Sequence, residues 1–345
     1  MAESKALPVV DKLAPSTASA KKDDRPFRPF ISKLRNSFGY SSEESDSSLS
    51  GDSDNQSGLS SLDEKTPLPQ CWGHRGASAA YPENTLASFE QAILDGSEGI
   101  ESATKLPAQR ICTFAETLEL LMRPSSRHVV LNVDVKLDND PEVLFKLMHQ
   151  MIKDFEDWET ELAPRLILGL WHCKYIEPAQ RLLPYCRLAH IGISPAIARK
   201  YFWDACSAFS LNYSTLLGKE GADFRADCKA AKKDLYVWTV NERPQMIQAT
   251  KWGVKAILTD RTADFLSLRR QMKKDWKSVA NEVDWSHAWS NLYYFTPINT
   301  IYMAWETFLM QRSAGPMVLP AAGGAVVKSP AISLPPVPAS DTSVQ

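Results

Sequence analysis

Two neighbouring stretches carry residues that could transfer a proton and bind an anion. A short apolar run ends in Gly73-His74-Arg75-Gly76, and Pro82-Glu83-Asn84-Thr85 follows just before a helical pattern. An imidazole, a guanidinium and a carboxylate therefore lie in the loop between a predicted strand and a predicted helix. His74 can exchange a proton near neutral pH, and Arg75 can bind an anionic oxygen. This loop is the first part of a candidate active site.

Acidic residues end the next two predicted strands, at Glu101 and Asp134. Carboxylates on neighbouring strands could share Mg²⁺ or Ca²⁺, which prefer oxygen ligands. Lys136 lies two residues after Asp134 and so on the same face of its strand. Arg75 and Lys136 beside a metal would suit a phosphate oxygen, so the set favours phosphodiester cleavage over acyl or hydride transfer. An internal ion pair between Asp134 and Lys136 remains an alternative.

These residues must be positioned by regular elements, and residues 67–275 alternate between strand and helix patterns. The strand candidates are short and apolar: 70–73, 99–101, 129–135, 166–170, 188–193, 208–211, 235–240 and 256–258. Helical patterns lie between them, as at 113–122, 141–153, 176–183, 221–232 and 244–252. Eight such units predict a (β/α)₈ TIM barrel, of the α/β class. A doubly wound open sheet is the alternative, but no GxGxxG follows a strand.

Polar or aromatic residues follow most of the predicted strands at their carboxyl ends. Besides those above, Trp171 follows the fourth strand, Asn241 the seventh and Asp260 the eighth. Barrel enzymes carry their sites at this end of the barrel. We therefore expect one site on this face. Glu101 and Asp134 could also serve a glycosidase, but the nearby cations favour a phosphate substrate.

The composition changes along the chain in four regions. Residues 1–66 are Ser-rich and acidic and are expected to be disordered, because they hold too few apolar groups to offset chain entropy. The barrel occupies 67–275, an aromatic-rich helical segment 276–312, and a second disordered tail, rich in Pro and Ala, 313–345. The uncharged stretch 288–305 could lie in a membrane interface, span a bilayer or pack on the barrel.

Charge, cysteines and the N-terminus bound the class of protein. The net charge of −2 gives no basic footprint for nucleic acid. Six cysteines without a CxxC pair are expected to be idle thiols in a reducing compartment. No signal-peptide pattern opens the chain. We therefore expect an intracellular protein associated with a membrane surface; organelle and oligomeric state do not follow.

The motifs, in this order and spacing, resemble the glycerophosphodiester phosphodiesterase family. The resemblance covers about residues 69–270 and is closest to the fungal phosphatidylglycerol-specific phospholipase C branch. It rests on Gly73-His74-Arg75-Gly76, Pro82-Glu83-Asn84-Thr85, Ile100-Glu101, Val133-Asp134-Val135-Lys136, Trp238-Thr239-Val240-Asn241 and Leu258-Thr259-Asp260. It implies a TIM barrel that uses a divalent cation to cleave a phosphodiester next to glycerol, with a phospholipid or glycerophosphodiester as substrate.

The resemblance also implies a role for each site residue. His74 would be one of two catalytic histidines, Arg75 would contact phosphate, and Glu101 and Asp134 would be metal ligands. The substrate pocket would be lined by Lys136, Trp171, Trp238 and Asn241. The loop behind His74 would be shaped by Glu83 and Asn84.

The sequence departs from this family directly after the second strand. The family has Glu-x-Asp and then a loop ending in His-Asp, whereas Ser102-Ala103-Thr104-Lys105 follows Glu101 here and no His-Asp dipeptide occurs. The second βα loop therefore looks truncated, without one metal ligand and the second catalytic histidine, which predicts strongly impaired turnover. Three explanations stay open: an inaccurate gene model or splice variant, a non-catalytic phospholipid-binding pseudoenzyme, or activity through a rearranged site. His172 is the candidate replacement.

Overall fold

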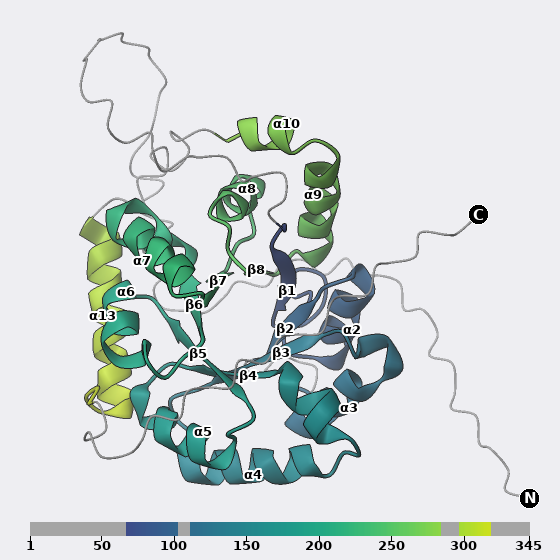
Figure 1. The fold of residues 1–345 in the computed structure, drawn as a ribbon, viewed down its shortest axis with the longest axis vertical. Helices are drawn as coiled ribbons and strands as arrows, with labels where there is room; N and C mark the ends of the chain where they lie inside the picture. Colours follow the sequence, from purple (N-terminus) through teal and green to yellow (C-terminus); the bar gives the residue numbers. More distant parts are fainter. Residues whose placement is uncertain (1–66, 103–110, 284–296, 319–345) are drawn as a thin grey trace, which may run out of the picture. The chain divides into compact units, whose positions relative to one another are not determined.

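The computed structural model describes residues 67–102, 111–283 and 297–318. Eight parallel strands close into a barrel in the order β1 to β8, with β8 paired to β1 (Figure 1). The expected TIM barrel is therefore confirmed. The strands are β1 (Gln70–His74), β2 (Gly99–Ser102), β3 (Val130–Val135), β4 (Leu166–Leu170), β5 (Arg187–Gly192), β6 (Ala208–Asn212), β7 (Asp234–Trp238) and β8 (Ala256–Thr259).

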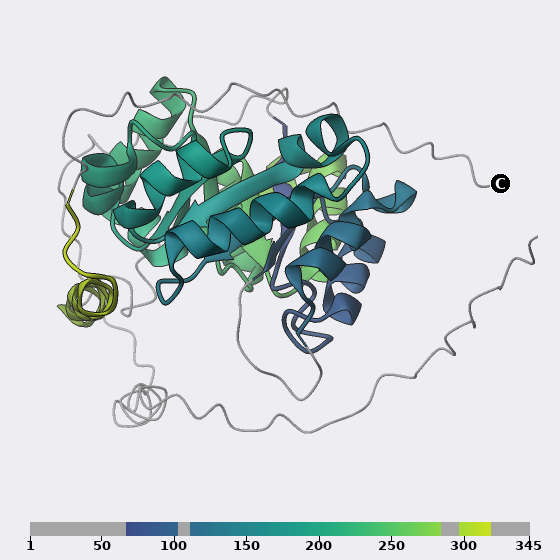
Figure 2. The same cartoon turned by 90° about the horizontal axis from the view of Figure 1, so that it is seen from below.

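Helices follow the strands and lie on the outside of the barrel (Figures 1 and 2). The longer ones are α2 (Leu86–Asp95), α3 (Phe114–Met122), α4 (Pro141–Lys153), α5 (Ile176–Leu182), α7 (Gly218–Ala230), α8 (Arg243–Lys251) and α9 (Thr262–Lys274). Beyond the barrel come α10 (Trp276–Asn281) and α13 (Pro297–Ala314). The tails at 1–66 and 319–345, and the first half of the aromatic stretch 288–305, lie outside the described residues.

Local signals set the ends of these helices. Thr113 and Glu116 form a capping box at α3, in which each side chain accepts from the other residue's backbone N–H. At α2, Thr85 accepts from the backbone N–H of Ser88, and Gly96 ends the helix with a φ of 102°. The Thr85 cap matters for function, because it fixes where the loop after His74 ends.

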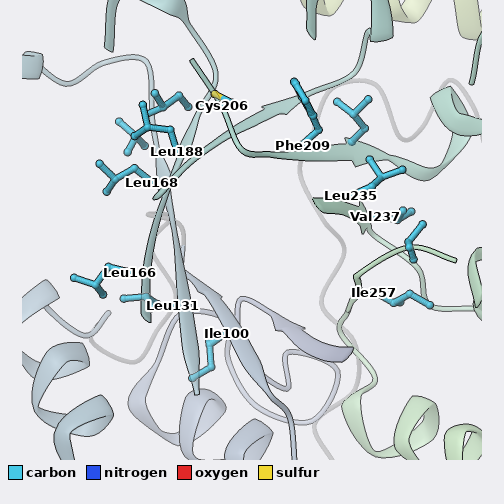
Figure 3. Packing of buried hydrophobic residues seen from close by; sticks show 14 of the residues in the cluster. Ile100, Leu131, Leu166, Leu168, Leu188, Cys206, Phe209, Leu235, Val237 and Ile257 are labelled. Carbon is cyan, nitrogen blue, oxygen red and sulfur yellow. The ribbon is translucent and has the colours of Figure 1, made fainter. Parts of the chain in front are cut away.

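Side chains alternate between two buried layers along the strands. The outward layer packs against the helices and includes Ile100, Leu131, Leu168, Phe209 and Val237 (Figure 3). A smaller inward cluster fills the lower barrel: Trp72, Val130, Ile167, Ala189, Ala208, Tyr236, Ala256 and Leu258. The barrel interior is therefore a packed core, and the polar residues lie above it.

The amino ends of the strands carry a structural ion pair. Arg187 donates to Asp234 at 2.8 Å, and the Trp72 and Tyr236 rings pack with centroids 4.5 Å apart. All six cysteines lie in the described residues, and none of them forms a disulfide bond. Within the ranges that the structure describes, no helix has the length and apolar character needed to cross a membrane.

Candidate active site

The carboxyl ends of the strands gather the charged residues predicted from the sequence. Glu101 is 5% exposed and Asp134 is 9% exposed. Burial raises the pKa of the Glu101 carboxyl, as does the neighbouring charge of Asp134. The positive charges of His74, Lys136 and Arg75 oppose this increase. The pKa of one buried carboxyl thus responds to four of the other predicted residues, so the barrel brings these five together.

His74 projects from the end of β1 between two carboxylates. Its Nδ1 lies 2.7 Å from Asp260 Oδ1, and its Nε2 lies 3.4 Å from Glu101 Oε2. Thr239 Oγ1 is 3.3 Å from the same Nε2. Burial alone would lower the pKa of His74, but Glu101 and Asp260 outweigh it and raise the pKa above its usual value. One ring nitrogen, Nδ1, therefore contacts Asp260, and the other, Nε2, faces Glu101 and Thr239.

Arg75 follows in an uncommon backbone conformation, with a φ of 59°. Its Nη1 donates to Glu83 Oε2 at 2.7 Å, and its carbonyl accepts from the backbone N–H of Asn84 at 3.1 Å. Glu83 and Asn84 both contact Arg75, and the loop-shaping role that the resemblance implies for them stays a prediction. The buried Nε of Arg75 has no hydrogen-bond partner among the described residues. A guanidinium with an unused donor suits an incoming phosphate oxygen.

Asp134, by contrast, is already engaged on both oxygens. Lys136 forms an ion pair with Oδ2, and the Trp171 indole donates to Oδ1 at 2.7 Å. The ion pair left open by the sequence is therefore present. The Trp171 and Trp238 rings meet edge to face at 5.8 Å, and Trp238 donates to the Ser210 carbonyl at 2.9 Å. These aromatic side chains form one wall beside Lys136.

The residues present do not by themselves complete a site for a divalent cation. Glu101 Oε2 is buried without a hydrogen-bond partner in the described part of the chain and could face a cation. Asp134 is the other carboxylate available, and both of its oxygens have partners. No group of three His, Cys, Asp or Glu side chains suited to a metal occurs in the described ranges. Hard cations take six or more ligands, so a cation would need oxygens from elsewhere.

Asn241 and His172 make contacts that the sequence analysis did not anticipate. Asn241 donates to Asp260 Oδ2 at 2.6 Å, so its amide serves the carboxylate, and its contact with substrate remains a prediction. His172 is buried, accepts from the backbone N–H of Lys174 and contacts the Gly315 carbonyl. It is occupied in local structure and does not supply a second acid–base group.

The sequence analysis placed Asp260 at the end of the eighth strand but assigned no site role to Asp260, Thr239 or Ser78. The sequence did hold a signal, because Asp260 ends the last strand, and the last strand of a closed barrel adjoins the first. Gly73 and Thr259 are partners in that pairing, which sets His74 beside Asp260.

A family model and curated proteins match the sequence of this chain. The model of the Glycerophosphoryl diester phosphodiesterase family matches residues 74–105 and 102–264. The glycerophosphodiester phosphodiesterase of Caldanaerobacter subterraneus is 21% identical over 246 residues, which are 57% of this chain and 96% of that protein. Glycerophosphodiester phosphodiesterase domain-containing protein 4 of Macaca fascicularis is 36% identical over 63 residues. That match spans 18% of this chain and only 10% of the macaque protein.

Solved structures of phosphodiesterases align with this chain at low identity. A phosphodiesterase of Oleispira antarctica, in complex with the product sn-glycerol-3-phosphate, is 18% identical with a TM-score of 0.49 and covers 59% of this chain and 97% of its own. The Thermotoga maritima glycerophosphodiester phosphodiesterase is also 18% identical, with a TM-score of 0.42 and coverage of 58% and 98%. Since the family model matches more than half of its residues, this chain belongs to the glycerophosphoryl diester phosphodiesterase family.

Proposed function

We propose that the carboxyl end of the barrel binds a glycerophosphodiester and cleaves one of its two P–O ester bonds. The observation that carries the proposal is the convergence of His74, Arg75 and Lys136 on the two buried carboxylates. Two fixed cations beside a histidine match a substrate that is anionic before and after the reaction. Family membership supports the same substrate class.

The chemistry that these residues can supply is hydrolysis. Water adds to phosphorus, the P–O bond to the leaving alcohol breaks, and a proton passes to the leaving oxygen. The Nε2 atom of His74 faces the site and is the group suited to that proton transfer. Arg75 and Lys136 would neutralise charge on the phosphoryl oxygens. A divalent cation, when bound, would add further charge neutralisation, and Glu101 would be its first ligand.

Within this family, we propose a phosphatidylglycerol-specific phospholipase C activity. The support is the sequence resemblance at the strand ends. Such a reaction releases diacylglycerol and glycerol phosphate, whereas a glycerophosphodiester releases glycerol 3-phosphate and a free alcohol. Incubation of the chain with phosphatidylglycerol and with glycerophosphoglycerol, followed by product analysis, separates the two. Turnover that is equal in wild type and His74→Ala would refute the site assignment.

We also propose that turnover by this chain is strongly impaired. Support comes from the family match, which falls into two segments that meet at residues 102–105, where the sequence lacks the Asp and His-Asp of the family. General acid–base groups contribute about 10²–10⁴-fold each, so the loss of one would leave slow catalysis. Sequencing the transcript across the codons for Ser102 and Ala103 tests the explanation. An in-frame segment that encodes Asp and His-Asp would mean that the functional enzyme has the complete loop.

A non-catalytic phospholipid-binding protein is the second candidate function. The observation that favours it is the combination of intact cations with a single acid–base histidine in the described site. Such a chain would bind the phosphodiester without hydrolysing it. Equilibrium binding of glycerophosphoglycerol, abolished by Arg75→Ala in a chain without detectable turnover, would support this reading. Robust turnover in the same preparation would refute it.

We further propose that the chain is intracellular and meets a membrane surface through α13. Ile301, Trp305 and Phe308 are spaced four and three residues apart, so they share one face, and they are 66%, 49% and 52% exposed. Exposed aromatic and apolar residues on one helical face favour an interfacial position. Co-sedimentation with phosphatidylglycerol vesicles should fall in Trp305→Ser/Phe308→Ser but not in Leu94→Ser, whose residue is an exposed leucine on α2. Equal sedimentation of all three chains would count against the proposal.

A further inference from the structure

Asp260 has a hydrogen-bond donor on each carboxylate oxygen. Oδ1 lies 2.7 Å from His74 Nδ1 and accepts from the Ser78 hydroxyl at 2.7 Å. Oδ2 accepts from the Asn241 side-chain amide at 2.6 Å. These partners come from the end of β1, the loop after it and the loop after β7, so the carboxylate is held from several directions. A carboxylate fixed in this way can in turn fix the ring that it contacts.

The orientation of the Asn241 amide follows from its other contacts. Its Oδ1 accepts from the Asp260 backbone N–H at 2.9 Å and from the Thr259 hydroxyl at 3.0 Å. A backbone N–H can only donate, so the oxygen of the amide must lie on that side. The NH₂ group is then left to face Asp260 Oδ2. Asn241 therefore acts as a clamp that joins the backbone and the side chain of Asp260.

The same contacts fix the charge of Asp260. Burial by itself would raise the pKa of this carboxyl, but the hydrogen bonds led by that from His74 lower the pKa to about 2. Near neutral pH the group is therefore ionised and can only accept hydrogen bonds. The His74 nitrogen at 2.7 Å from it must carry a hydrogen. In the neutral ring the second nitrogen, Nε2, then has a free lone pair.

We propose that Asp260, clamped by Asn241, is the positioning residue that holds His74 in the Nδ1–H tautomer with Nε2 directed at the reacting phosphodiester. The inference rests on the proposed function for the identity of the reacting group. It gives Asn241 a different role from substrate contact. It also confines proton transfer to one ring atom, which lies 3.4 Å from Glu101 Oε2 and 3.3 Å from Thr239 Oγ1. An Asp that orients a catalytic imidazole acts in this way in serine proteases.

The tautomer can be measured without any turnover. Chain labelled with ¹⁵N-histidine gives long-range ¹H–¹⁵N spectra in which protonated and bare ring nitrogens differ, and His74→Ala assigns the signal among the six histidines. The neutral ring of the wild type should show a hydrogen on Nδ1. Asp260→Asn should give a mixture of tautomers. Asp234→Asn, the same change at the opposite end of the barrel, should leave the signal unchanged. A His74 ring with its hydrogen on Nε2 in the wild type would overturn the inference.

Kinetics then separate positioning from substrate contact. Asn241→Ala leaves Asp260 in place but unclamped, so kcat should fall about 10-fold or more with little change in KM, since the loss lies in alignment. Asp260→Asn should lower kcat by about 10²–10⁴-fold. A rise in KM alone in Asn241→Ala would assign Asn241 to the substrate and refute the clamp. If the wild type shows no turnover, the proposed activity fails for this chain, while the ¹⁵N spectra still decide the tautomer. If Asp260→Asn does not fold, the spectra and kinetics of Asn241→Ala still test the inference.

Discussion

Replacing Gly76 by alanine should destabilise the barrel by about 2–5 kcal/mol, because two separate costs fall on this position. The φ of Gly76 is +86°, in the left-handed region, where a Cβ costs about 1–2 kcal/mol. A Cβ would also lie 2.3 Å from Ser88 Oγ and 2.7 Å from the Ser88 carbonyl atoms. A change of rotamer can move the hydroxyl but not the backbone, so overpacking adds about 1–3 kcal/mol.

The same substitution should also reduce any activity, because Ser88 supports the catalytic loop. The Ser88 hydroxyl donates to the Arg75 carbonyl at 3.0 Å, and the Ala77 backbone N–H donates to the Ser88 carbonyl at 2.9 Å. Pushing Ser88 away from Gly76 therefore shifts Arg75 and its neighbour His74. A loss of 2–5 kcal/mol is a large share of the roughly 5–15 kcal/mol that stabilises a typical domain.

Urea denaturation of wild type, Gly76→Ala and Gly218→Ala measures the two costs separately. Gly218 has a φ of +66° but nothing within 4 Å of its Cβ position, so its substitution should carry only the conformational cost of about 1–2 kcal/mol. The difference between the two variants gives the steric part. Equal losses of stability in the two variants would show that the loop relaxes around the new methyl group and would refute the reasoning.

Three further predictions follow from the described contacts. His190 is buried and its pKa falls to about 4, so stability should drop by up to about 3 kcal/mol between pH 6.5 and pH 4, where only the unfolded chain binds the proton. The raised pKa of His74 changes stability only above pH 6.5, so the two effects are separable. In urea titrations, His190→Gln should reduce the loss of stability between pH 6.5 and pH 4; the same loss in wild type and variant would contradict this. Arg75→Lys should lower kcat/KM by about 10–100-fold, the value of one charge-assisted hydrogen bond, in initial-rate assays. Adding 1 mM Ca²⁺ should stabilise the chain by less than about 0.5 kcal/mol in thermal unfolding, because few carboxylate oxygens in the described site lack a partner. A stabilisation of about 4 kcal/mol would instead indicate a complete cation site.

The strands could be located from sequence because a buried parallel strand is a short, nearly continuous apolar run. The fourth was predicted at 166–170 and lies at Leu166–Leu170, and the eighth differs only by the addition of Thr259. Helix starts were equally local, as the Thr113–Glu116 capping box shows. The seventh strand was drawn two residues too long, to 240, because Thr239 and Val240 have high strand propensity but lie beyond the last ladder pair at Trp238.

Contacts within the site were less predictable, because most of them join residues far apart in the chain. Lys136 and Asp134 are two residues apart, so their shared face followed from strand geometry, and they do form an ion pair. The bond from His74 to Asp260 joins residues separated by 186 positions. It depends on barrel closure and on the register between β1 and β8, which no local pattern specifies.

The two halves of the site differ in how complete they are. The proton-transfer half, His74 with Asp260 and Asn241, has its main polar contacts made by described residues. The cation half is incomplete, since the buried Glu101 Oε2 has no hydrogen-bond partner among the described residues and Asp134 is bound by Lys136 and Trp171. Loss of a loop after Ser102 would remove a ligand from the cation half and leave the His74 network intact. Restoring that loop should therefore raise the affinity for a cation and leave the tautomer of His74 unchanged.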